Sequence, residues 1–184
     1  MARSALILVD LQNDYLPDGD WPVDGMEAAV QSARGLLTRA RDTGLPVFHI
    51  RHEATSPTAP FFRPGTKGAD IVADLSPRAD EPVIHKHRPN SFHETDLKTR
   101  LHDAEVTHVI LAGAMTQMCI DATARAARDF GFGVTVAQDA CAARAINWNG
   151  VTVPASQVQA TILSALKMSY ARVLPTGEII TAMA

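Results

Sequence analysis

Short apolar runs alternate with amphipathic helical patterns along almost the whole chain, and this alternation limits the fold more than any other feature. The short runs are typical of strands buried on both faces, whereas the longer segments place apolar residues three and four apart, as helices do. We expect strands at 5–9, 47–50, 82–85, 106–111, 134–137 and 171–174. We expect helices at 26–42, 94–103, 117–130 and 154–168. This order predicts an α/β fold with a doubly wound, mainly parallel six-stranded sheet and helices on both faces.

Length and charge narrow the class of protein further. The 184 residues suit one domain, 1–184, because the chain shows no internal repeat and no linker. A net charge of -3 argues against a nucleic-acid partner. No apolar run reaches the roughly 20 residues that cross a bilayer, so we expect no membrane partner. The first ten residues lack a signal-peptide pattern and the two cysteines should stay reduced, so we expect a cytoplasmic protein.

The segment 52–81 interrupts the regular alternation. It is rich in proline, glycine, threonine and acidic residues, and only 69–75 shows a short helical pattern. A loop of this length in a compact domain is usually functional or covers a site.

Three reactive side chains follow expected strands at the same edge of the predicted sheet. Asp10 follows the first strand, Lys86 the third and Cys119 the fourth. In such sheets the ligand crevice lies beyond the carboxyl ends of the strands. Asp10 could accept the thiol proton as a general base, and Lys86 should lower the pKa of the thiol and keep the carboxylate ionised. The start of the helix at 117–130 would favour a thiolate and offer backbone N–H groups to an oxyanion.

Each of these residues also has an ordinary structural interpretation. Cys119 could be a small apolar residue that packs at the start of a helix, which is how most free cysteines behave. Asp10 could be a turn residue, and Lys86 could be a solvated lysine at a strand end. The convergence of all three at one edge supports the catalytic interpretation more strongly than any one of these residues does.

Three separated motifs surround the reactive residues. They read Asp10-x-Gln12-x-Asp14, Lys86 with Asn90-Ser91-Phe92, and Gly113-x-x-Thr116-x-x-Cys119. The pattern extends to Thr123, Arg125 and Ala126, and then to Asp139-Ala140-Cys141-Ala142. In order and spacing these motifs resemble those of the isochorismatase-like cysteine hydrolase family, and the resemblance covers 4–175.

The resemblance implies a strand order of 3-2-1-4-5-6 and an Asp10–Lys86–Cys119 triad that hydrolyses small amides through a thioester. It also implies a non-proline cis peptide bond between Ala114 and Met115, which would direct the N–H groups of Met115 and Cys119 at the substrate oxygen. Family members are often homo-oligomers whose neighbouring subunits help to close the site. We therefore expect a homo-oligomer.

The metal site of nicotinamidases in this family is not matched by the sequence. Those enzymes carry an aspartate and histidines after the second strand, whereas this chain reads His49-Ile50-Arg51-His52-Glu53. No third ligand is spaced to complete a site with His49 and His52, so we expect neither a metal nor another cofactor. True isochorismatases cleave a vinyl ether without a cysteine nucleophile, so Cys119 argues against that reaction as well.

Several further residues could contact a substrate, but the sequence leaves their roles open. Gln12 could instead bond to loop backbone, and Asn90 could cap a helix that begins at 94. Loop aromatics such as Phe61 and Trp148 could form a subunit interface rather than cover the crevice. The candidate substrate-binding residues are Gln12, Tyr15, Phe61, Asn90, Phe92 and Trp148.

The sequence therefore predicts a cofactor-independent cysteine hydrolase that cleaves the C–N bond of a small amide, ureide or lactam. Two other classes remain open. A thiol-reactive or redox protein would use Cys119 without hydrolysis. A non-catalytic binding protein with the same fold would have no need for a carboxylate, an ammonium group and a thiol at one edge.

Overall fold

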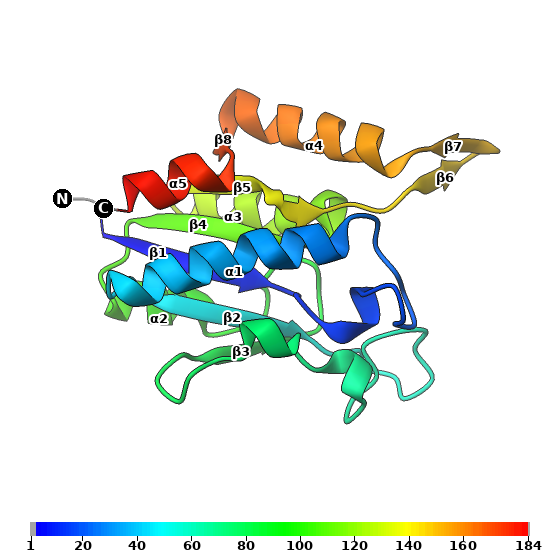
Figure 1. Ribbon diagram of the computed structural model, residues 1–184, viewed down its shortest axis with the longest axis horizontal. Helices are drawn as coiled ribbons and strands as arrows, with labels where there is room; N and C mark the ends of the chain where they lie inside the picture. Colours follow the sequence, from blue (N-terminus) through cyan, green and yellow to red (C-terminus); the bar gives the residue numbers. More distant parts are fainter. Residues whose placement is uncertain (1–2, 184) are drawn as a thin grey trace.

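A computed structural model describes residues 3–183 and shows a three-layer α/β arrangement (Figure 1). Six strands form one sheet in the order β3-β2-β1-β4-β5-β8, and every neighbouring pair is parallel. Since β8 is the sixth expected strand, the predicted order 3-2-1-4-5-6 is confirmed. No helix within 3–183 is both long and apolar enough to pass through a membrane.

The regular elements follow the expected sequence closely. The sheet consists of β1 (Ser4–Val9), β2 (Val47–His52), β3 (Val83–Lys86), β4 (His108–Ala114), β5 (Gly133–Ala142) and β8 (Arg172–Leu174). A separate hairpin pairs β6 (Ile146–Trp148) with β7 (Val151–Val153). The helices are α1 (Met26–Asp42), α2 (Leu97–Asp103), α3 (Asp121–Asp129), α4 (Ala155–Ser169) and α5 (Thr176–Ala182).

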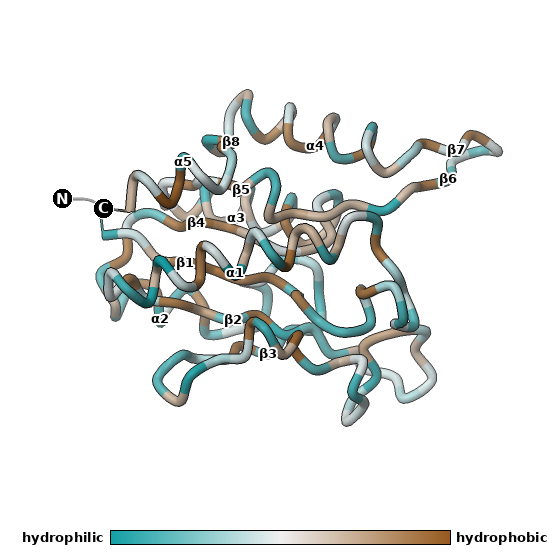
Figure 2. Tube along the Cα trace, viewed as in Figure 1, coloured by the Kyte–Doolittle hydropathy of each residue, from teal (hydrophilic) through white to brown (hydrophobic). Residues whose placement is uncertain are grey.

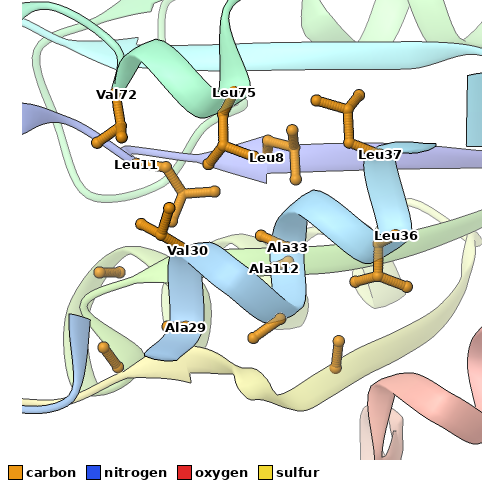
Figure 3. Close-up of a cluster of buried hydrophobic side chains, with 14 of the residues drawn as sticks. Leu8, Leu11, Ala29, Val30, Ala33, Leu36, Leu37, Val72, Leu75 and Ala112 are labelled. Carbon is orange, nitrogen blue, oxygen red and sulfur yellow. The ribbon is translucent and has the colours of Figure 1, made fainter. Parts of the chain in front are cut away.

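Two apolar cores lie on opposite faces of the sheet because successive side chains of each buried strand point to opposite sides. On β1, Leu6 and Leu8 face the core formed with α1 and α5, whereas Ala5, Ile7 and Val9 face the core formed with α2, α3 and α4. Figure 3 shows the first core, in which α1 packs across β1. The central strands are accordingly apolar in Figure 2, whereas the loops near β3 are largely hydrophilic.

The structure differs from the expected helices at two ends near the carboxyl edge of the sheet. The helix expected at 94–103 begins at Leu97, because Glu94 has a positive φ of 54° and Thr95 donates its hydroxyl to the Ser91 carbonyl. The helix expected at 117–130 is divided into a π-helical turn, η4 (Thr116–Ile120), and α3. A π-helical turn widens the helix locally and is frequent at functional sites.

The β6–β7 hairpin and helix α5 were not expected. The β6–β7 hairpin turns at Asn149-Gly150, where both residues have positive φ, so this dipeptide is the hairpin signal that the sequence contained. The hairpin extends beyond the body of the domain in Figure 1. Helix α5 contains a glycine and β-branched residues that disfavour helix, and it is held by burial of Ile179 against the α1 side of the sheet.

Glu81 anchors the loop before β3 to the rest of the domain. Its carboxylate accepts two hydrogen bonds from Arg41 at 2.8 Å and one from the Arg78 backbone N–H, and it lies 3.0 Å from the His49 imidazole. Burial raises the pKa of Glu81, but these bonds outweigh burial and lower it to about 2.

We expect Glu81→Gln to lower the free energy of unfolding by roughly 2 kcal/mol at neutral pH, since the folded state loses a paired carboxylate. Because the pKa of Glu81 falls on folding from 4.5 to about 2, this stabilisation is present above pH 4.5 and disappears as the pH falls toward 2. Urea unfolding across this pH range measures both effects. Glu105→Gln, in an exposed pair with Arg3, is the control and should change stability little. A Glu81→Gln protein as stable as this control would contradict the expectation.

Candidate active site

Three strand ends bring Asp10, Lys86 and Cys119 together. Asp10 follows β1 with a positive φ of 52°, Lys86 ends β3, and Cys119 lies in η4 directly after β4. The Lys86 Nζ lies 2.8 Å from the Asp10 Oδ2, and both side chains are fully buried. The structure thus places the three residues at one edge of the sheet, as the sequence predicted.

The Lys86 ammonium group is surrounded by acceptors. Besides Asp10, it donates to the carbonyl oxygens of Arg88 at 3.0 Å and Pro89 at 3.2 Å. Burial lowers the pKa of Lys86, but attraction to Asp10 outweighs it and the net pKa is raised. Burial likewise raises the pKa of Asp10, and the Lys86 charge overcomes this, so the net pKa is lowered. The resting site therefore holds an ammonium group and a carboxylate.

A second layer of bonds holds the chain segment after Lys86 in place. The Thr123 hydroxyl on α3 lies 2.9 Å from the Ser91 hydroxyl and accepts a hydrogen bond from the Ser91 backbone N–H. Both side chains are buried. This contact ties the turn that carries the Arg88 and Pro89 carbonyls to the helix that follows Cys119.

The Cys119 thiol is protonated in the resting site, which corrects the expectation that Lys86 and the helix start would lower its pKa. Cys119 is 3% exposed, and burial raises the pKa of its thiol. The nearby Asp10 carboxylate raises this pKa further, and the opposing effect of Lys86 is smaller. Neither oxygen of the buried Asp10 carboxylate has a hydrogen-bond partner among residues 3–183, and only Oδ2 is paired with Lys86, so the carboxylate is available to receive the thiol proton.

The turn between β4 and Cys119 is built from unusual backbone geometry. The peptide bond between Ala114 and Met115 is cis, as the family resemblance implied. Gly113 has a φ of 140°, and a Cβ atom there would collide with the Val9 carbonyl oxygen. Only glycine therefore lets β4 approach β1 beside Asp10. Cys141 pairs with Gly113 across the sheet and is also buried, and burial raises the pKa of its thiol to about 12.

Among the expected substrate-binding residues, Gln12 and Tyr15 are buried and contact other parts of the protein. The Gln12 amide accepts a hydrogen bond from the His52 N–H and donates to the His52 and Ala69 carbonyls, all at 2.8 Å. Gln12 therefore bonds to the protein backbone and not to a ligand, which is the alternative that the sequence left open. Tyr15 is 1% exposed and packs against Phe61 and Phe62.

The other four expected residues do not form a common binding surface. Phe61 stacks on Trp21, with ring centroids 4.9 Å apart, and Phe92 belongs to the core beside Phe132. The Asn90 side chain accepts a hydrogen bond from the Phe92 N–H, so it closes a turn and does not cap a helix at 94. Trp148 is 73% exposed on the projecting hairpin. Periodicity and spacing could not distinguish these packed aromatics from pocket aromatics.

One residue at the centre of the site was missed by the sequence analysis. His52 ends β2 opposite Lys86, and its Nδ1 lies 3.3 Å from the Lys86 Nζ and 3.8 Å from the Asp10 Oδ2. His49, three residues earlier, points to the other face of the sheet and contacts Glu81. The signal in the sequence was the position of His52 at a strand end, but it was considered only with His49.

Asp10, His52 and Cys119 offer one ligand atom each within 4.8 Å of one another. A carboxylate, an imidazole and a thiol can bind zinc. Here, however, the Lys86 ammonium group already neutralises the Asp10 carboxylate at 2.8 Å and would repel a cation. The charge arrangement suits proton transfer better than metal binding.

We expect Gly113→Ala to lower the free energy of unfolding by roughly 3 kcal/mol, because the new Cβ would push β4 away from β1 and favour a different φ. Thermal unfolding measures the loss. Gly177→Ala is the matched control: a Cβ at Gly177 meets nothing within 4 Å, and alanine favours the helix α5. If both variants melted like the wild type, the close approach at Gly113 would not be a constraint.

Comparison with known proteins gives consistent matches. The isochorismatase domain model matches residues 4–174. The chain is 41% identical over 173 residues to YddQ, an uncharacterized isochorismatase family protein of Bacillus subtilis, covering 94% of this chain and 96% of that protein. It is 32% identical over 151 residues to maleamate amidohydrolase of Pseudomonas putida, covering 74% and 71% respectively. A crystal structure of an isochorismatase hydrolase from Oleispira antarctica has a TM-score of 0.95 and 47% identity, covering 97% of this chain and 96% of that one.

Proposed function

Because this chain belongs to the isochorismatase family of hydrolases, we propose that it is a cysteine hydrolase that cleaves the C–N bond of a small amide, ureide or lactam. The observation that carries the proposal is the buried Asp10–Lys86 pair beside the Cys119 thiol. The name of maleamate amidohydrolase, a relative at 32% identity, supports the choice of a C–N bond.

Acylation begins with Asp10. Because the resting thiol is protonated and the carboxylate is ionised, Asp10 takes the proton as the sulfur attacks the substrate carbonyl. The N–H groups of Met115 and Cys119 are proposed to stabilise the oxyanion. Asp10 then gives its proton to the leaving nitrogen, and the acyl group remains on Cys119 as a thioester. Lys86 keeps the Asp10 carboxylate ionised before the attack and holds its side chain in position.

The two other functional classes fit the structure less well. A redox or thiol-reactive protein needs an accessible thiolate, whereas the Cys119 thiol is buried and its pKa is raised. A binding protein would gain little from a fully buried ion pair, because removing two charges from water is costly. A hydrolase uses both features, since its base must be ionised and its nucleophile is activated only when substrate is present.

We expect Cys119→Ala to abolish hydrolysis, with turnover falling roughly a thousandfold or more, because no acyl-enzyme can form. Ammonia or amine release is measured over a panel of maleamate, N-carbamoyl amino acids and small lactams. Intact mass spectrometry then detects an acyl adduct that hydroxylamine removes. Cys141→Ala is the matched control, because Cys141 is equally buried but contacts neither Asp10 nor Lys86, and it should retain turnover. Full activity in Cys119→Ala would show that another group is the nucleophile.

A further inference from the structure

We propose that His52 is the general base of the second half-reaction, in which water hydrolyses the thioester, while Asp10 serves the first. This inference rests on the proposed function and assigns a separate proton acceptor to each half-reaction.

His52 is the member of the cluster that reaches solvent. Its side chain is 18% exposed, whereas the Asp10 and Lys86 side chains are fully buried and Cys119 is 3% exposed. Once an acyl group is attached to Cys119, a water molecule entering the site meets the imidazole before it can meet the Asp10 carboxylate. One ring nitrogen of His52 lies within 4.8 Å of the Cys119 Sγ, a separation that one bridging water can span.

The Lys86 ammonium group has more acceptors than protons. It carries three N–H bonds, but Asp10, the Arg88 and Pro89 carbonyls and the His52 Nδ1 all lie within 3.3 Å of Nζ. When Lys86 donates to the first three, the His52 Nδ1 is released from Lys86 and is free to bind a proton. A bond from Lys86 to the His52 Nδ1 is therefore not needed to satisfy the ammonium group.

His52 is also held in position as an acid–base group requires. The Gln12 amide bonds to both the N–H and the carbonyl of His52 at 2.8 Å, across 40 residues of sequence. The imidazole packs against the Phe62 ring, with centroids 5.7 Å apart. Gln12 and Phe62 are both fully buried. This support fixes the ring beside the thioester without contacting the ring nitrogens.

The proposed step is balanced in atoms and charge. His52 takes one proton from water while the oxygen bonds to the acyl carbon. The C–S bond then breaks, and the His52 imidazolium returns the proton to the sulfur. The products are a carboxylic acid and the resting Cys119 thiol, which matches the protonated thiol of the free site. The groups facing His52 during this step are Asp10 directly after β1, Lys86 from β3 and Cys119 from η4.

The test separates the two half-reactions with p-nitrophenyl acetate as the probe. Stopped-flow release of p-nitrophenolate measures acylation, and intact mass spectrometry measures decay of the acetyl-enzyme. We expect His52→Asn to acylate within about twofold of the wild type and to deacylate roughly 10- to 100-fold more slowly, so that acetyl-Cys119 accumulates. Asn keeps a polar atom near the Nδ1 position but cannot carry the proton. Asp10→Asn should show the opposite pattern, with slow acylation.

Two further variants distinguish proton transfer from support of the fold. His52→Ala should regain deacylation when imidazole is added, which a structural role would not produce. His85→Asn is the matched control, because His85 lies beside Lys86 on the opposite face of β3 and its side chain is 48% exposed. It should behave like the wild type in both phases.

The outcomes separate the two proposals. Wild-type deacylation in His52→Asn, or equal slowing of both phases without rescue by imidazole, would overturn the role of His52 while leaving the hydrolase intact. If the wild-type protein released no p-nitrophenolate and no variant carried an acetyl-Cys119 adduct, the proposed function would instead be removed, and this inference with it.

Discussion

The buried pair between Asp10 and Lys86 is the interaction on which the site depends. Two charges removed from water are stable only when each is paired and bonded, and breaking such a pair leaves an uncompensated charge in the interior. The fold meets this requirement with parallel strands that end together, with the Arg88 and Pro89 carbonyls around the ammonium group, and with the Ser91–Thr123 contact that fixes their turn. Much of the carboxyl edge of the sheet is arranged around one ion pair.

The same pair determines the protonation state of the Cys119 thiol. A carboxylate next to a buried thiol opposes ionisation of that thiol, and Lys86 is too fully engaged with Asp10 to reverse the effect. The raised pKa keeps the sulfur a thiol in the free protein. This protects Cys119 from oxidation, because oxidants react with the thiolate.

Strand ends were the most predictive feature of the sequence. Asp10, Lys86 and Cys119 could be placed together because parallel strands direct their carboxyl ends to one edge, whatever the details of packing. Phe92 and Gln12 could not be assigned in this way. An aromatic ring after a strand suits a core and a pocket equally well. Whether an amide binds backbone or ligand depends on segments 40 and 57 residues away. The Asn149-Gly150 turn, in contrast, is a local signal that could have predicted the β6–β7 hairpin, although the hairpin was not expected.

His52 shows why pairwise spacing misleads at the end of a strand. Considered with His49, it suggested an incomplete metal site, yet residues three apart on a strand face opposite sides of the sheet. Its partners lie on the neighbouring strands, and the register that pairs His52 with Lys86 exists only after the sheet forms. Gln12 then fixes the His52 backbone from the loop after β1, so the strand that supplies Asp10 also positions the imidazole beside it. The amide of Gln12 is fully used inside the protein because it joins the loop after β1 to the backbone of His52 and Ala69.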